Sequence, residues 1–339
     1  MDEVEEKAKL YVENLLTEGA KSSCDDYTKS SEEHEDLPSY YDEELFKKGQ
    51  SFYHKHIFSF MGAKFMGLLT VLAIPTIVKI LIHTRMSGSD LTAYKRYIAT
   101  IFHMTVWYEA DFKPGSKLWK SIAQVKGLHN SASNNSCKAG INRISQKDMA
   151  LTQFGFMGYQ LTREKHFGIH NTSEEEWRAY IHLWRVIGHL LGIEDRFNLC
   201  TGTVQEVQAK CEKLIEKVFL PCVKRKDAEF TEMSRHLVNG LWVFSPILNF
   251  NVAYCSLVMM LQDKFDPKNF EEYHKLTRWE TFLFYLTGFV FFSLKWTISR
   301  WYHNHTRYRD LWLIRNFPFL AYYKFGFKNS HVYILKKVS

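Results

Sequence analysis

The chain has 339 residues, of which 46% are hydrophobic, 24% charged and 16% aromatic. Such a chain can bury a large core, and its 7 prolines and 17 glycines exclude a collagen-like or low-complexity polymer. The net charge of +7 divides unevenly, because residues 1–50 hold 15 acidic and 6 basic side chains and the remainder holds 22 acidic and 38 basic ones. A basic body indicates an anionic partner such as a membrane surface, or else plain solubility.

The N-terminal segment, residues 1–36, is polar and acidic, so we expect a disordered, solvated tail there. From Leu37 onward the composition is that of a folded protein. We therefore predict a helical domain over residues 37–262 and a C-terminal extension over residues 263–339, which is aromatic and basic.

Apolar residues recur at helical spacing along most of the body, and no run alternates in the way a β-strand would. The spacing predicts helices over 43–62, 94–110, 115–130, 148–161, 175–191, 203–219 and 227–262, with a break at Ser245-Pro246 in the last. Residues 131–146 are polar and are expected to form a loop. The predicted fold class is therefore all-α.

Two stretches are apolar enough to raise the question of a membrane. Residues 65–82 contain Pro75 and Lys79, which favour a kinked core helix over a membrane span. Residues 281–298 are followed by residues 299–339, which have a net charge of +7 and eleven aromatic residues. That order favours a membrane anchor with a basic flank over a buried helix with a basic tail.

Polar side chains on two predicted helices are candidates for a binding site. Arg96, Thr100 and His103 share one helical face, which either is exposed to solvent or lines a cavity for an anionic ligand. His129 ends the next apolar pattern, with Lys126 one turn earlier. A neutral imidazole there could bind a metal or a haem iron, although a single histidine is often structural.

A further polar stripe, of His182, Arg185 and His189, crosses an otherwise apolar helix and implies either a satisfied hydrogen-bond network or the lining of a site. Zinc bound there with Asp195 is disfavoured, because no carboxylate lies between the two histidines. The six cysteines form no C-x-x-C pair, which excludes a zinc ribbon and a covalently attached haem. No nucleic-acid-binding motif is present.

Several segments follow one another in a specific order: YDEELF at 41–46 with Gly49-Gln50, RxxxT at 96–100, VKGLH at 125–129, ISQKDM at 144–149 with FGF at 154–156, and HLWRVIGHLLGI at 182–193. In this order and spacing, the chain resembles the family that joins ER-bound fungal oxygenases of the MpaB type with bacterial rubber oxygenases, the latex clearing proteins. The resemblance covers roughly residues 40–260, and the last segment is its most specific part.

The resemblance implies a globin-like helical bundle around a pocket for one non-covalent haem b. The family's proximal ligand falls on His129, and its pocket arginine and threonine fall on Arg96 and Thr100. Haem propionates are anions, which gives Arg96 and Lys126 a reason to point inward. His103, His182, Arg185 and His189 are weaker candidates for the pocket lining.

The sequence departs from the rubber-cleaving members at three positions. Ala99 stands where they have a distal lysine, Ile80 where they have a carboxylate, and Lys126 where an arginine is usual. Haem binding survives these changes, whereas polyisoprene cleavage by the bacterial route does not follow.

From these observations we expect a haem-b-dependent oxygenase that acts with O2 on an apolar substrate, such as an isoprenoid or lipid, with Arg96 and Thr100 as catalytic residues. We expect it at the endoplasmic reticulum membrane, with a cytoplasmic location as the alternative, and without a nucleic-acid partner. Two alternatives remain. One is a helical carrier of haem or lipid without catalysis, and the other is a membrane scaffold spanning at residues 65–82, 240–261 and 281–298.

Overall fold

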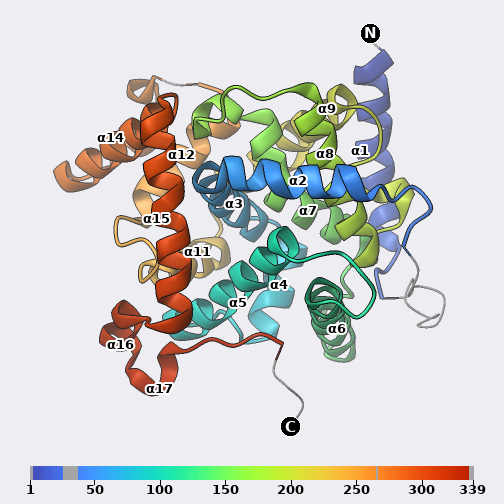
Figure 1. Cartoon of the computed structure of the whole chain (residues 1–339), viewed down its shortest axis with the longest axis horizontal. Helices are drawn as coiled ribbons and strands as arrows, with labels where there is room; N and C mark the ends of the chain where they lie inside the picture. The colour runs from blue at the N-terminus through green and yellow to red at the C-terminus, as the bar shows by residue number, and fades with distance from the viewer. Residues whose placement is uncertain (1–2, 26–36, 265, 336–339) are drawn as a thin grey trace.

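The computed structural model describes residues 3–25, 37–264 and 266–335. Within these residues every regular element is helical and there is no β-strand, so the predicted all-α class is confirmed. The helices run in several directions around a shared interior (Figure 1). The N-terminal helix lies at one side, and the C-terminal helices lie at the opposite side and bottom of the view.

The first part of the chain contains eight α-helices and one 3-10 turn within its described residues: α1 Glu3–Lys21, α2 Glu43–Lys55, α3 Ile57–Leu72, α4 Pro75–His83, α5 Asp90–Glu109, α6 Lys117–Lys138, α7 Gln146–Thr162, η2 Glu164–Phe167 and α8 Glu174–Leu190. The next part, which includes a π-helical turn at η4, comprises η3 Asp195–Phe197, α9 Val204–Leu214, η4 Ile215–Phe219, α10 Leu220–Arg225, α11 Ala228–Leu241 and α12 Phe250–Leu261. The C-terminal part comprises η5 Pro267–Asn269, α13 Glu271–His274, α14 Arg278–Ser293, α15 Thr297–Asn316, α16 Phe319–Phe325 and α17 Phe327–Ser330.

Capping residues set the beginnings of the central helices. Ser89, Ser145 and Ser173 each accept a hydrogen bond from a backbone N–H of the first turn of α5, α7 and α8, as part of a capping box. α8 ends just before Gly192, whose φ of +99° is the left-handed conformation that glycine tolerates best. The predicted start and stop of α8 therefore have a direct structural cause.

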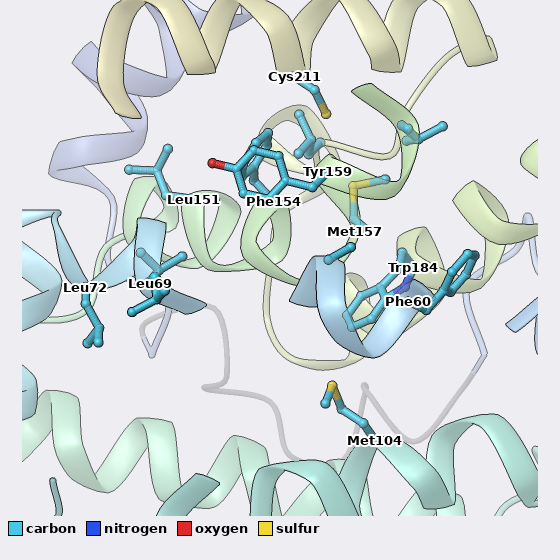
Figure 2. Packing of buried hydrophobic residues seen from close by; sticks show 14 of the residues in the cluster. Phe60, Leu69, Leu72, Met104, Leu151, Phe154, Met157, Tyr159, Trp184 and Cys211 are labelled. Carbon is cyan, nitrogen blue, oxygen red and sulfur yellow. The ribbon is translucent and has the colours of Figure 1, made fainter. Parts of the chain in front are cut away.

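The core is centred on α3, α7 and α8, as seen from close by in Figure 2. At the crossing of α3 and α7, Gly67 and Gly155 bring the two backbones together. A Cβ atom at Gly67 would lie 1.8 Å from the carbonyl oxygen of Gly155. Near this crossing, the hydroxyls of Thr70 and Tyr159 form a hydrogen bond of 2.7 Å across the same two helices. Many of the surrounding side chains are large and fully buried: Phe60, Phe154, Trp184, Tyr108 and Tyr180 among them.

The N-terminal segment differs from the prediction of a solvated tail over 1–36. Residues 3–21 form α1, which packs against α9 through a face that repeats every three or four residues, and Tyr11 donates a hydrogen bond of 2.7 Å to the carbonyl of Phe197. The many glutamates obscured this amphipathic pattern in the sequence, because most of them lie on the solvated face, while the half-buried Glu5 pairs with Lys213 of α9 at 2.7 Å. The acidic cluster at 30–36 lies outside the described residues, and the other domain boundaries remain predictions.

The prediction of a loop over 131–146 is wrong for residues 131–138, because α6 continues to Lys138, whereas residues 139–145 do connect α6 to α7. Ser133 and Ser136 are buried in this extension. The Ser133 hydroxyl accepts a hydrogen bond of 3.0 Å from the N–H of Ile144. Small polar residues that would suit a loop are here the inward face of a helix.

The apolar stretches do not form straight membrane-length helices. Residues 65–82 divide at Pro75, where α4 begins, and residues 240–261 divide between α11 and α12. Among the described helices, none is by itself long and apolar enough to cross a bilayer. Two successive pairs reach that length and composition together, α3 with α4 and α14 with α15, but they bend by 90° and 113°.

The crossing of α3 and α7 gives a test of the fold. We expect Gly67→Ala to lower the free energy of unfolding by at least about 2 kcal/mol, because the added methyl would meet backbone and the helices would have to separate. Gly288→Ala is the matched control, since a Cβ there meets nothing within 4 Å and helix propensity favours alanine. Urea unfolding followed by circular dichroism measures both, and equal stability of the two variants would contradict this packing.

Candidate functional site

Arg96 and Thr100 lie one turn apart on α5, and both are half-buried. The Thr100 hydroxyl donates a hydrogen bond of 3.0 Å to the carbonyl of Arg96, which leaves its oxygen free to accept another. The guanidinium of Arg96 has no hydrogen bond or ion pair with any described residue, and burial lowers its pKa. A guanidinium stays charged in proteins, so this one is a partly desolvated cation without an acidic partner among the described residues.

His129 lies near the middle of α6, also half-buried. Its Nδ1 atom is buried and has no hydrogen-bond partner among the described residues. Burial, and then the positive charge of Arg96, lower the pKa of His129 to about 4. The imidazole is therefore neutral at neutral pH, which is the form that binds a metal.

Lys126 precedes His129 by about one turn, and burial lowers the pKa of its amine. It too has no carboxylate partner among the described residues. Other buried cations have partners: Arg163 pairs with Glu212, and the amine of Lys210 donates a hydrogen bond of 2.7 Å to the carbonyl of Thr201. The region where α5 and α6 carry Arg96, Lys126 and His129 is thus unusual in gathering basic groups without an acid.

These groups fit a haem in their chemistry. Two unpaired cations can bind the two propionates, and an imidazole nitrogen without a partner can ligate iron. The Thr100 oxygen can accept a hydrogen bond near the same helix face. Arg96, Lys126 and His129 could also bind another anion that contains a metal or an apolar part.

His103, predicted on the same face as Arg96, has a structural partner. Its Nδ1 lies 2.7 Å from the hydroxyl of Ser121, which also accepts a hydrogen bond of 2.9 Å from the indole N–H of Trp107. Burial lowers the pKa of His103 to about 4. This network joins α5 to the first turns of α6 and thereby fixes the helix that carries His129.

The polar stripe of α8 faces the segment that leads into α2. His182 Nε2 accepts a hydrogen bond of 3.0 Å from the N–H of Asp42. Arg185 donates one of 3.0 Å to Asp195, and its guanidinium lies 3.6 Å from the ring centroid of Tyr40. The ring of His189 lies edge-on to that of Tyr40, with centroids 6.1 Å apart.

Much of the stripe thus has partners on other segments, although the buried Nε of Arg185 has none among the described residues. Both predicted roles of the stripe, a hydrogen-bond network and the lining of a site, remain predictions. Among the described residues no three histidine, cysteine or acidic side chains are grouped to hold a metal ion. Haem iron needs only one protein ligand, so a single histidine suffices there.

An apolar cavity of about 280 Å³ lies among α3, α5, α11, α12, α14 and α15. Its lining includes Ile101 and Met104 of α5 but none of Arg96, Thr100, Lys126 and His129. On α5, however, the first residue that lines the cavity is Ile101, which directly follows Thr100. One helix thus carries both the cationic group and one wall of the cavity.

Lys64 is the polar residue that sequence reasoning missed. Its side chain is only 2% exposed, and its amine forms a hydrogen bond of 2.9 Å with the hydroxyl of Tyr108. The ammonium position lies 4.5 Å from the ring centroid of Tyr53 and 4.1 Å from that of Tyr108. Burial lowers its pKa well below the ordinary value. The signal was a lysine between two apolar stretches with no acid one turn away on either side.

An unpartnered histidine alone does not make a ligand site, as His56 shows. This side chain is fully buried between the rings of Phe52 and Phe60, and neither ring nitrogen has a partner among the described residues. Burial lowers its pKa to about 3. What distinguishes His129 is the pair of unpaired cations that accompany it.

Comparison with known proteins identifies one family. The family described as ER-bound oxygenase mpaB/B'/rubber oxygenase, catalytic domain, matches residues 52–284. The rubber oxygenase of Streptomyces sp. (strain K30) is 32% identical over 68 residues, which are 20% of this chain and only 16% of that protein. The structure of latex clearing protein LCP in the closed state has a TM-score of 0.55 at 15% identity, over 84% of this chain and 78% of that one. At that identity the structural likeness supports the fold alone.

The buried His56 gives a pH prediction. Its folded pKa lies below that of the unfolded chain, so the unfolded state binds the extra proton and stability falls as the pH falls from about 6.5 to about 3. We expect His56→Phe to reduce this decline by up to about 1.4 kcal/mol per pH unit. Urea unfolding between about pH 7 and about pH 4 measures it. The exposed His305→Phe is the control, and an unchanged slope for His56→Phe would contradict the assignment.

Proposed function

The chain belongs to the family of ER-bound oxygenase mpaB and rubber oxygenase catalytic domains, and on this premise we propose that it is a haem-b-dependent oxygenase acting with O2 on an apolar, isoprenoid or lipid, substrate. The observation that carries the proposal is the group of unpaired Arg96, Lys126 and neutral His129 on facing parts of α5 and α6. An anionic, metal-containing ligand would compensate all three at once.

Each residue has a role that follows from its chemistry. His129 would ligate the iron through an imidazole nitrogen, and Arg96 and Lys126 would hold the propionates. Thr100 would orient a polar group through its free lone pair. When bound, haem b supplies the iron chemistry that activates O2.

The substrate would occupy the apolar cavity whose wall includes Ile101 and Met104. Aliphatic and aromatic side chains bind a hydrocarbon chain through burial of its surface, and they keep water from the reacting region. Because Thr100 directly precedes Ile101 on α5, one end of such a hydrocarbon chain would lie near α5, the helix that also carries Arg96.

A second candidate function, a haem or lipid carrier without catalysis, is favoured by two specific positions. Ala99 offers no distal base, and Ile80, where the rubber-cleaving members have a carboxylate, is only 4% exposed and packs as an ordinary core residue. Incubation of the haem-loaded protein with squalene under O2 distinguishes the two functions. Cleaved or hydroxylated squalene supports the oxygenase, and bound haem without product selects the carrier.

We expect the purified protein to bind haemin with a Soret band, and His129→Ala to lose the axial bond and change that spectrum. His305→Ala is the control, since that imidazole is exposed on α15. Absorption spectroscopy of the three proteins measures the effect. A wild type that binds no haemin, or an unchanged spectrum in His129→Ala, would defeat the haem assignment.

Arg96 can be tested by affinity. We expect Arg96→Met to weaken haemin binding by about tenfold or more, because a charge-assisted hydrogen bond to a propionate is lost, and Arg96→Lys to recover part of it. Haemin titration followed at the Soret band measures both. Equal affinity in Arg96→Met would remove Arg96 from the site.

The cavity can be tested separately with Nile red, a neutral apolar dye. Ser256 lines the cavity and is half-buried. We expect Ser256→Phe to fill part of the space and weaken Nile red binding by about fivefold or more, while haemin binding is retained. Unchanged dye affinity would show that the cavity is not the apolar site.

A further inference from the structure

α14 is apolar on every side, although the protein covers only one side of it. Residues 281–294 contain no charged side chain. Leu283 is buried, and Phe291 packs against Phe58 and Phe167, with ring centroids 5.7 and 5.5 Å apart. A helix that is hydrophobic all round is normally enclosed by protein or lipid. The outer side of α14 has neither within the described structure, and Figure 1 shows the helix projecting from the body.

The outer side carries a row of aromatic residues. Their spacing of three or four residues places them on one helical face, and all are more than half exposed: Trp279 at 63%, Phe282 at 53%, Tyr285 at 52%, Phe289 at 62% and Phe292 at 56%. The row continues around the bend into α15 with Trp296, Ile298 and Trp301, which are exposed by 51%, 83% and 67%. We call these eight residues the aromatic face. So much exposed aromatic surface marks an interaction site.

The chemistry of the aromatic face and its flanks fits a lipid surface. Tryptophan and tyrosine are the residues enriched at the level of lipid headgroups. Arg278 and Lys295 stand at the two ends of α14, and the Lys295 ammonium lies 3.6 Å from the ring centroid of Phe292 and 4.7 Å from that of Trp296. The segment that follows, residues 299–339, has a net charge of +7, complementary to anionic headgroups.

We propose that α14 docks this protein on an anionic lipid bilayer, lying in the plane of the membrane with the aromatic face among the lipids. The bend of 113° between α14 and α15 suits a helix that lies on the surface and whose continuation returns to the protein. Docking requires no cofactor, so its failure would leave the proposed oxygenase activity untouched.

The inner side of α14 gives the docking a consequence for the cavity. Thr287, Val290 and Phe291 line the cavity of about 280 Å³, opposite the side that carries the aromatic face. The helix is thus a wall between the lipid and the cavity. An apolar ligand of that cavity would be drawn from the bilayer rather than from water, where it is scarcely soluble.

The test uses the full chain and sedimentation with vesicles of equal parts phosphatidylcholine and phosphatidylserine. We expect the wild type to bind these vesicles, to bind pure phosphatidylcholine more weakly, and to show a blue shift of tryptophan emission. Phe282→Ser/Phe289→Ser/Phe292→Ser should weaken binding by about 30-fold or more, because three large rings no longer enter the lipid. These side chains are exposed, so circular dichroism should show an intact fold.

The matched control is Leu10→Ser/Ile82→Ser/Met86→Ser, which removes three exposed apolar side chains elsewhere on the surface. It should bind vesicles like the wild type. Absence of vesicle binding by the wild type, or equal binding by both triple variants, would overturn the proposal. So would a wild type that is a dimer, fails to bind vesicles, and dissociates when the three phenylalanines are changed, since a second copy would then cover this face.

Discussion

The structure depends on how it accommodates positive charge away from water. An unpaired buried cation costs several kcal/mol, and Glu212 compensates the buried Arg163. Lys64 is accommodated instead by aromatic rings and a tyrosine hydroxyl. Among the described residues, Arg96 and Lys126 have neither an acid partner nor an aromatic ring and hydroxyl of this kind. In the proposed function their compensation comes from a ligand, and the neutral imidazole of His129 suggests that this ligand contains a metal.

Helix α5 links the parts of this account. Its capping box fixes where it begins, and Gln50 of α2 donates hydrogen bonds of 3.0 and 2.9 Å to the carbonyls of Trp107 and Ala110 at its end. Between these points it carries Arg96 and one wall of the apolar cavity, and the hydrogen bond between His103 and Ser121 ties it to α6. α14 forms another wall of the cavity. The proposed cofactor site, the apolar cavity and the proposed lipid-facing helix are thus connected through α5 and α14.

The sequence predicted the helices well where apolar spacing and caps agree, as in α8, which runs from the Ser173 capping box to Gly192. It failed at α1 and at the end of α6, because charged or small polar residues there occupy a solvated or tightly packed helical face. The shared face of Arg96 and Thr100 was predictable from spacing. The partners of His103 and the α8 stripe were not, because Ser121, Asp42 and Asp195 are brought to them only by tertiary packing.

Polar residues of the segments that carry the family resemblance can have structural partners. Gln50, Gln146 and Asp148 each form a hydrogen bond with the backbone or a side chain of another segment. For only one set of residues, we propose that one haem b is held by His129 and the adjacent cations. Iron analysis together with a pyridine haemochrome spectrum of the purified protein tests it most directly. The account predicts one iron and one haem b per chain, and a folded protein that contains neither, and takes up neither from added haemin, would contradict it.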